Sequence, residues 1–190
     1  MERSVDHLLV GVTGSAAIFN QLSYLIVLRA IVAKEVRVIM TPAADAMLPA
    51  STVVHVCDNV FVDAVPGIEK RPGHIELAQW SDAFVILPAS ANVIGQAANG
   101  IAPNLLTTTI LASPTPVIFC PNVNEDMWSK RAVQRNIETL RSDGHLVIQP
   151  ELKMIYEVGS GGMRESWAMP DPERLAERLR ELLEGPGCPD

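Results

Sequence analysis

Short runs of apolar residues alternate along the chain with longer segments that are typical of helices. The apolar runs predict strands at residues 7–12, 36–40, 59–62, 83–87, 117–120 and 146–148. The longer segments predict helices at residues 16–33, 74–80, 104–111, 129–142 and 171–183. Because strands that are apolar along their whole length are buried on both faces, this order predicts a three-layer α/β fold, in which helices cover both faces of a parallel sheet.

No internal repeat, low-complexity segment or linker divides the chain. Its 190 residues fit one domain, which we expect to span residues 1–184 and to be followed by a frayed tail at residues 185–190. Residues 152–170 show little periodicity, so this stretch is expected to be a mobile lid or clamp, or else a disordered surface loop. The hydrophobic fraction of 48% excludes a disordered chain and indicates buried subunit contacts in addition to a core.

The charge and cysteine content exclude several classes of function. With 15 Lys and Arg residues against 22 Asp and Glu residues, the net charge of −7 provides no basic surface for nucleic acid. Three widely separated cysteines, without a C-x-x-C pair or a histidine at ligand spacing, predict neither a disulfide framework nor a metal site. No apolar run reaches the roughly 18 residues of a membrane span, so we expect a soluble, cytoplasmic protein.

In parallel sheets of this kind ligands bind at the carboxyl ends of the strands, and the first such end carries a Gly-Ser turn. Gly11 and Gly14 allow close approach of the backbone, Thr13 and Ser15 provide hydroxyl groups, and the following helix offers free N–H groups. The turn lacks both the G-x-G-x-x-G pattern and the Walker lysine, and no acidic residue ends the second strand to bind a ribose. A monophosphate such as that of FMN therefore fits better than a nicotinamide dinucleotide, with a plain tight turn as the equal alternative.

Two further strand ends carry small or polar side chains. After the fourth strand, Ala89, Ser90, Ala91 and Asn92 would let a flat ring approach the backbone, although an ordinary serine helix cap accounts for the same residues. After the fifth strand, residues 121–128 combine two amides, two carboxylates, a methionine and a tryptophan. This composition favours a ligand site over a connecting turn.

Three single residues in these segments are candidates for chemistry. Asn124 can both donate to and accept from a substrate carboxylate or amide. Met127 is a possible ligand contact, or half of a hydrophobic staple with the tryptophan that follows it. His74 begins a short predicted helix, whose positive end favours a neutral imidazole able to act as a base, although most histidines at helix starts have no such role. The other three histidines are expected to be structural or solvated.

Taken in order, three of these features resemble the homo-oligomeric flavin-containing Cys decarboxylases, the family of phosphopantothenoylcysteine decarboxylase and the lantibiotic peptidyl-cysteine decarboxylases. They are His74, the PASANV sequence at residues 88–93 and the PNVNEDMW sequence at residues 121–128. The resemblance runs from the first turn to about residue 170. It implies a flavodoxin-like fold, bound FMN, and homotrimers, sometimes assembled into homododecamers, with flavin sites at the subunit contacts.

The resemblance also assigns cofactor contacts. It implies that the turn at residues 11–15 and Thr41 contact the FMN phosphate, and that residues 89–92 contact the flavin. The chain departs from the family pattern at two positions, where Val93 replaces a threonine and Val123 replaces a methionine. These changes remove one hydroxyl group near the flavin and reshape one wall of the site.

On the substrate side, the resemblance implies that His74 is the catalytic base. Asn124 and Met127 would hold the carboxylate and the thiol-bearing end of the substrate, with Asn124 also aligning the bond that breaks. The clamp beyond the last strand would supply further substrate contacts from Gly161, Gly162, Met163 and Arg164.

The clamp also indicates where the reaction stops. Family members of the pantothenate pathway carry a clamp cysteine, which donates a proton as the reduced flavin returns electrons to the enethiol intermediate. No cysteine occurs between residues 121 and 187 of this chain. The resemblance therefore implies FMN-dependent oxidative decarboxylation of the C-terminal cysteine of a precursor peptide to an aminoenethiol, for aminovinyl-cysteine formation in a ribosomal peptide natural product.

Other functions compete with this one. A phosphopantothenoylcysteine decarboxylase of coenzyme A biosynthesis would need a proton donor other than a clamp cysteine. A non-catalytic, flavin-binding regulatory subunit would be expected to depart at the catalytic positions, whereas His74 and Asn124 are both present. A flavin prenyltransferase shares the fold, but PASAN and PNVN are the wrong motifs for it.

Overall fold

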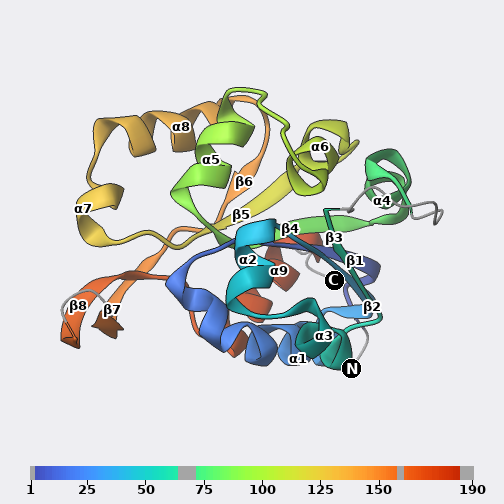
Figure 1. The fold of residues 1–190 in the computed structure, drawn as a ribbon, viewed down its shortest axis with the longest axis horizontal. Coiled ribbons are helices and arrows are strands. Elements are labelled where there is room, and N and C mark those ends of the chain that lie inside the picture. Colours follow the sequence, from blue (N-terminus) through green and yellow to red (C-terminus); the bar gives the residue numbers. More distant parts are fainter. Residues whose placement is uncertain (1–2, 64–71, 158–160, 185–190) are drawn as a thin grey trace, which may run out of the picture.

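The computed structural model describes residues 3–63, 72–157 and 161–184, and the tail expected to be frayed lies outside these residues. Within them, one six-stranded parallel sheet has the strand order β3-β2-β1-β4-β5-β6 (Figure 1). Its strands are β1 (Val5–Val12), β2 (Ala33–Met40), β3 (Asn59–Val62), β4 (Ala83–Ala89), β5 (Val117–Pro121) and β6 (Leu146–Val147). Helices cover both of its faces, so the predicted three-layer α/β fold is confirmed.

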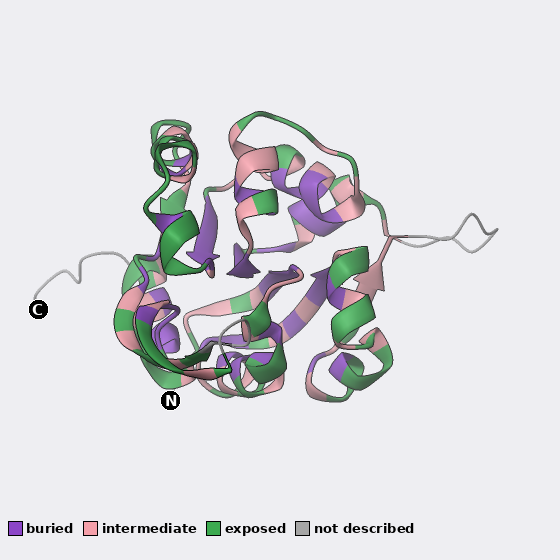
Figure 2. Cartoon of the chain, turned by 60° about the vertical axis from the view of Figure 1, so that its left-hand side comes forward, coloured by how far each residue is buried: buried purple, intermediate pink, exposed green. Residues whose placement is uncertain are grey.

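Each face of the sheet has its own hydrophobic core, because neighbouring residues of a strand point to opposite sides. Val38 of β2 belongs to one buried cluster and Ile39 to the other. Figure 2 shows the buried residues concentrated in the strands and on the helix sides that face them. β2 begins at Ala33, earlier than predicted, because Ala33 and Glu35 already pair with β1 although the polar Lys34 and Glu35 interrupt the apolar run.

The helices divide between the two faces. One face carries η1 (Ala16–Asn20), α1 (Gln21–Ile31), α2 (Pro42–Met47), α3 (Ala50–Val53), η2 (Val54–Val56) and α9 (Pro172–Glu184). The other carries α4 (His74–Trp80), α5 (Ala91–Ala98), α6 (Leu105–Ala112), α7 (Glu125–Trp128) and α8 (Arg131–Ser142). The predicted first helix opens as a 3₁₀ turn, because the hydroxyl group of Ser15 donates to Asn122 Oδ1 (2.9 Å) instead of capping the helix.

Residues 151–168 contain an antiparallel hairpin, formed by β7 (Glu151–Glu157) and β8 (Gly162–Ala168), which projects from the rest of the molecule (Figure 1). The alternative of a disordered surface loop is therefore wrong for the described part of this stretch, whereas its role as a lid or clamp stays a prediction. Leu152, Met154 and Tyr156 lie on one face of β7, where they are exposed, and along the strand they alternate mostly with charged residues. This alternation is typical of a strand and could have indicated β7, but it does not show that the apolar face is the exposed one.

None of the helices in the described segments is both long and apolar enough to span a membrane. The same residues contain no group of three or more His, Cys, Asp or Glu side chains arranged to hold a metal ion. Burial raises the pKa of the Cys57 thiol to about 11 and raises that of Cys120 as well. Both thiols are therefore protonated at neutral pH, which makes them poor nucleophiles and poor metal ligands.

His145 precedes β6 and makes contacts that require a neutral ring. Its Nδ1 accepts a hydrogen bond from the backbone N–H of Val117 (3.1 Å), and burial lowers its pKa below the usual 6.5. The unfolded chain therefore takes up a proton on acidification before the folded chain does, so we expect the free energy of unfolding to fall as the pH drops below about 6.5. His145→Asn keeps an acceptor and removes this titration. In urea unfolding at pH 7.5 and 5.5 (about one unit on either side of 6.5), the free energy of unfolding of the variant should fall less between the two pH values than that of the unmodified protein. An equal fall would contradict the assignment.

Candidate functional site

A cavity of about 510 Å³ opens at the carboxyl ends of β1, β2 and β4. Six residues predicted to contact the cofactor line it: Thr13, Gly14, Thr41, Ser90, Ala91 and Asn92. Its wall also contains Met127, predicted to contact the substrate, and Val93, whose position the resemblance placed near the flavin. Four further lining residues were not identified from the sequence, namely Pro42, Ala43, Gln96 and Asn104. Gln96 follows Asn92 by one turn of α5, so helical spacing could have identified it.

Thr13 joins the turn after β1 to the turn after β4. Its side chain is buried, its hydroxyl group donates to the Pro88 carbonyl (2.6 Å), and its Oγ1 accepts a hydrogen bond from the backbone N–H of Ser90 (3.0 Å). The Thr13 hydroxyl hydrogen is thus already used within the protein. Among the described residues, no acceptor is bonded to the backbone N–H groups of Gly14 and Ser15, so these groups are the available donors for an anion.

Three residues predicted to bind the cofactor lie outside the cavity lining: Gly11, Ser15 and Ala89. Gly11 is buried in β1, where a Cβ atom would come within 2.5 Å of Leu106 Cδ1, so this glycine serves close packing. Ala89 is fully buried at the end of β4. Ser15 is turned toward Asn122, whose backbone N–H in turn donates to the Ala89 carbonyl (2.9 Å). These three residues shape the turns that border the cavity.

Asn124 is the N-cap of α7, and this role fixes its side-chain amide. Its Oδ1 accepts a hydrogen bond from the backbone N–H of Met127 (2.8 Å), which leaves the amide NH₂ group to donate elsewhere. The two residues that could have formed a staple are separated: Trp128 is buried in the core, whereas Met127 is 42% exposed and lines the cavity. The loop thus presents one amide donor and one thioether at the same edge of the sheet.

A second, smaller cavity of about 60 Å³ lies where α7 faces β8, and it brings Asn124 together with Arg164. Glu125, Asp126, Glu165 and Ser166 complete its lining. Met163 is not among the lining residues; it is 60% exposed and pairs with Tyr156 across the hairpin. Gly161 is exposed and has a positive φ of 67° at the start of β8. Of the predicted clamp contacts, Arg164 is the one that the structure brings to Asn124.

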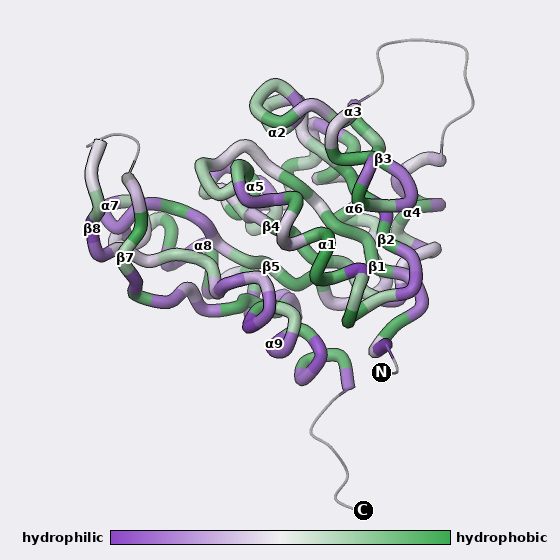
Figure 3. The backbone as a smooth tube through the Cα atoms, turned by 90° about the horizontal axis from the view of Figure 1, so that it is seen from below, coloured by the Kyte–Doolittle hydropathy of each residue, from purple (hydrophilic) through white to green (hydrophobic). Residues whose placement is uncertain are grey.

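His74 is the first residue of α4, as predicted, and its side chain is partly exposed. It lines neither of the two cavities described above. Figures 1 and 3 both place α4 and α7 at opposite ends of the molecule. A single chain therefore does not bring His74 and Asn124 together. The helices α4 and α7 cover the same face of the sheet but lie at opposite ends of it.

The sequence model of the flavoprotein family matches residues 1–171. The chain belongs to the flavoprotein family. This flavoprotein is 42% identical over 167 residues to mersacidin decarboxylase of Bacillus sp. (strain HIL-Y85/54728), a match that covers 88% of this chain and 85% of that protein. The resemblance drawn from the three motifs is thereby confirmed.

Two further relatives bear on the choice of substrate. This flavoprotein is 35% identical over 187 residues to the coenzyme A biosynthesis bifunctional protein CoaBC of Haemophilus influenzae, covering 96% of this chain but 45% of CoaBC. It superposes with a TM-score of 0.76 on the structure of SpaF, an FMN-dependent cysteine decarboxylase, at 30% identity and over 95% of this chain and 98% of that chain. The fold of the whole domain is therefore shared with a cysteine decarboxylase.

Proposed function

We propose that this flavoprotein is an FMN-dependent peptidyl-cysteine decarboxylase. It oxidatively decarboxylates the C-terminal cysteine of a precursor peptide to an aminoenethiol, which then enters an aminovinyl-cysteine ring of a ribosomal peptide natural product. The observation that carries the proposal is the cavity at the strand ends, which gathers residues of the PASANV segment and Met127, with Asn124 next to it. The similarity to mersacidin decarboxylase supports the same activity.

The cavity suits FMN in its size and in the chemistry of its lining. A volume of about 510 Å³ lies in the range of cofactor sites, and the lining residues offer hydroxyl, amide and backbone groups. Gly14 permits the first turn to lie so close to α2 that a Cβ atom there would be 2.9 Å from the Ala43 Cβ. The Oε1 atom of Gln96 is buried without a hydrogen-bond partner among the described residues, so the cavity wall contains an acceptor for a donor of the ligand.

The close approach at Gly14 yields a prediction. The nearest atoms to an added methyl group belong to Ala43, including its carbonyl carbon at 3.2 Å, and none of them ends a flexible side chain. We expect Gly14→Ala to push α2 from the turn, to lower the free energy of unfolding by about 1–3 kcal/mol, and to weaken FMN binding about tenfold. Fluorescence titration of apoprotein with FMN measures the affinity. Gly73→Ala is the control, because an added Cβ atom there meets nothing within 4 Å. Gly100→Ala is not suitable, because Gly100 has a positive φ that alanine rarely adopts.

The cavity residues would hold FMN, which would supply the oxidising power: it would take two electrons and one Cβ hydrogen as the Cβ–S unit of the substrate cysteine becomes a thiocarbonyl group. The Asn124 amide donates to the substrate carboxylate and orients it so that the breaking bond aligns with the thiocarbonyl group. Met127 contacts the thiol-bearing end, and His74 takes up the proton that the thiol loses. The carboxylate then leaves as CO₂, because the thiocarbonyl group accepts its electron pair, and the product is the aminoenethiol.

We expect the complete site to form between subunits of a homotrimer, or of a homododecamer built from trimers. The separation of α4 and α7 supports this arrangement, because His74 of one subunit can reach the Asn124 end of its neighbour in a closed ring. The expected location is the cytoplasm, where precursor peptides are made.

The first experiment is mass spectrometry of short peptides ending in cysteine, incubated in air with the yellow, FMN-loaded protein. A loss of about 46 Da, for CO₂ and two hydrogen atoms, is the expected result of the oxidative route. Phosphopantothenoylcysteine serves as the competing substrate. A loss of about 44 Da from it would place the protein in coenzyme A biosynthesis and would overturn the proposal, because electrons would then return to the product.

The similarity to CoaBC makes the coenzyme A reaction the second candidate. It requires a proton donor beside the enethiol, and no cysteine occurs between residues 121 and 187 to provide one. If neither substrate changes mass, and peptides that retain their leader segment also remain unchanged, the regulatory, non-catalytic function is favoured.

A further inference from the structure

The C-terminal end of α4 contacts β1 and β2 through Trp80, the last residue of this seven-residue helix. The guanidinium carbon of Arg37 lies 3.9 Å from the centroid of the Trp80 ring, and the ring centroids of His7 and Trp80 are 4.8 Å apart. The contact with Arg37 is a cation–π interaction, which favours one position of the indole relative to β2. Side chains of two different strands therefore hold the end of the helix.

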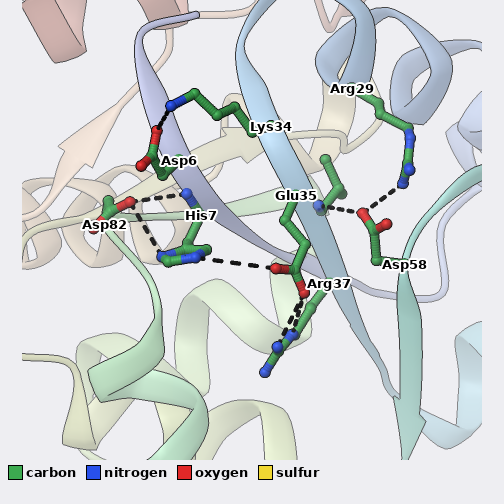
Figure 4. Close-up of polar contacts among 9 residues, drawn as sticks. Asp6, His7, Arg29, Lys34, Glu35, Arg37, Asp58 and Asp82 are labelled. Carbon is green, nitrogen blue, oxygen red and sulfur yellow. Dashed lines mark hydrogen bonds and ion pairs between the residues drawn. The ribbon is translucent and has the colours of Figure 1, made fainter.

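Arg37 and His7 are themselves held in place. Glu35 Oε1 accepts hydrogen bonds from Nε and Nη2 of Arg37, at 3.1 and 3.0 Å (Figure 4). The backbone N–H of His7 donates to Asp82 Oδ2 (2.8 Å), and the backbone N–H of Asp82 donates to the His7 carbonyl (3.0 Å). Because Asp82 follows α4 by two residues, these bonds fix the exit of the helix to β1. We call Trp80, Arg37, Glu35, His7 and Asp82 the Trp80 anchor.

The other end of the same helix carries His74, whose side chain forms no hydrogen bond with any described residue. Within the described part of the chain, the first turn of α4 is bonded only to itself, by the backbone N–H of Gly73 donating to Glu76 Oε2 (2.8 Å). At a rise of about 1.5 Å per residue, His74 and Trp80 are separated by about 9 Å along the helix axis. The position of His74 therefore depends on the buried middle of α4 and on the Trp80 anchor.

We propose that Arg37 and Trp80 are positioning residues that determine where α4 presents His74. The proposal rests on the proposed function, in which His74 is the base. A displacement of about 1 Å in a catalytic group can lower a rate about a hundredfold, and a short helix transmits a small rotation at one end into such a displacement at the other. Neither residue lines the cavity or contacts Asn124, so their effect falls on turnover and not on the binding of FMN or peptide.

The first test compares Arg37→Met with the matched control Arg29→Met. Methionine keeps an apolar, unbranched side chain and removes the guanidinium group. Arg29 forms an ion pair at the same edge of the sheet, but with Asp58 and from α1, outside the Trp80 anchor (Figure 4). We expect Arg37→Met to lower kcat about tenfold with unchanged KM and FMN affinity, and Arg29→Met to leave kcat unchanged. Arg37→Lys keeps a cation beside Trp80 but loses the pair of hydrogen bonds that the guanidinium group donates to Glu35. Its kcat should therefore lie between those of Arg37→Met and the unmodified protein.

Equal kcat values for Arg37→Met and the unmodified protein would overturn the proposal, as would a loss that Arg29→Met reproduces. A rise in KM, or weaker FMN binding, with kcat unchanged would also overturn it, since these would show an effect on the cavity. Should Arg37→Met fail to fold, Trp80→Leu replaces it, because leucine keeps an apolar side chain at the end of α4 and removes the aromatic face that Arg37 and His7 contact. The same kinetic outcomes then decide.

A second test places Arg37→Met in one kind of subunit only. Hetero-oligomers contain His74→Asn subunits, which keep a working Asn124, and Asn124→Asp subunits, which keep a working His74. We expect Arg37→Met to reduce the rate about tenfold in the subunit that supplies His74 and to have no effect in the His74→Asn subunit. Equal effects in both subunits would contradict a positioning role within the same chain. If hetero-oligomers of His74→Asn and Asn124→Asp subunits show no activity even without Arg37→Met, the shared site of the proposed function is wrong. The comparison of Arg37→Met with Arg29→Met then still decides the role of the Trp80 anchor.

Discussion

Two inactive variants are expected to restore activity when they assemble together. His74→Asn removes the base, which α4 carries at one end of the molecule. Asn124→Asp removes the amide NH₂ group that donates to the substrate carboxylate, at the opposite end beside α7. Each change alone should lower kcat/KM by about a thousandfold. In a ring of three subunits each site takes His74 from one chain and Asn124 from the next, so random assembly of equal amounts leaves about one quarter of the sites with both residues. Coexpression, followed by a peptide assay, should recover about this fraction of the unmodified rate.

The matched control is the double variant, His74→Asn with Asn124→Asp, assembled with an equal amount of unmodified protein. A site shared between neighbours again leaves about one quarter of the sites intact, whereas a site within one chain leaves about one half. A rate near one half in the control, with no recovery in the first mixture, would show that each subunit works alone. Bound flavin, measured by its visible absorbance, should be similar in all mixtures because neither residue lines the cavity.

The sequence predicted the sheet well because its strands are buried on both faces. β4 is buried throughout, and a short apolar run of this kind, bounded by turns, is typical of a central strand in a parallel sheet. The hairpin of β7 and β8 was not predictable in the same way. Its strands pair with each other and not with the main sheet, and the exposed Met154 and Tyr156 give it an apolar outer face. Apolar and charged residues alternate along β7 as in other strands, but the apolar face is the exposed one, so the pattern predicts the wrong face to be buried.

The rule that ligands bind at the carboxyl ends of parallel strands located the cavity, but it could not assign single atoms. Thr13 was predicted to offer its hydroxyl group, and the structure uses that group to join two turns. Gly11 matches a phosphate-binding turn in sequence, yet it packs against Leu106. The sequence alone does not distinguish a glycine that lies close to a ligand from one that lies close to a side chain of the core. The distance between His74 and Asn124 was equally invisible, because motif order carries no information about which end of the molecule a helix occupies.

The second large effect is expected for Asn124→Asp on its own, since this change separates the structural role of the residue from its chemistry. The Oδ1 of Asn124 caps α7, and an aspartate caps a helix as well as an asparagine while its charge favours the positive helix end. The fold and the FMN affinity should therefore be unchanged. The substrate carboxylate, however, loses the hydrogen bond from the NH₂ group, which weakens its binding by about 2 kcal/mol. It is also repelled by the negative charge of the new aspartate, which weakens its binding further, by about 1–4 kcal/mol. Together these effects predict a loss of about a thousandfold in kcat/KM.

Asn20→Asp is the matched control, because Asn20 also precedes an α-helix, is exposed, and makes no capping bond with its side chain. It introduces the same charge outside both cavities and should leave kcat/KM unchanged. A peptide whose C-terminal carboxylate is replaced by a carboxamide cannot be decarboxylated but can compete for the site. Its inhibition constant should be nearly the same for Asn124→Asp and the unmodified protein, because an amide is not repelled by the new charge, whereas a carboxylate product analogue should bind much more weakly to the variant. If both inhibitors weaken equally, Asn124 shapes the site without contacting the carboxylate, and the assignment is wrong.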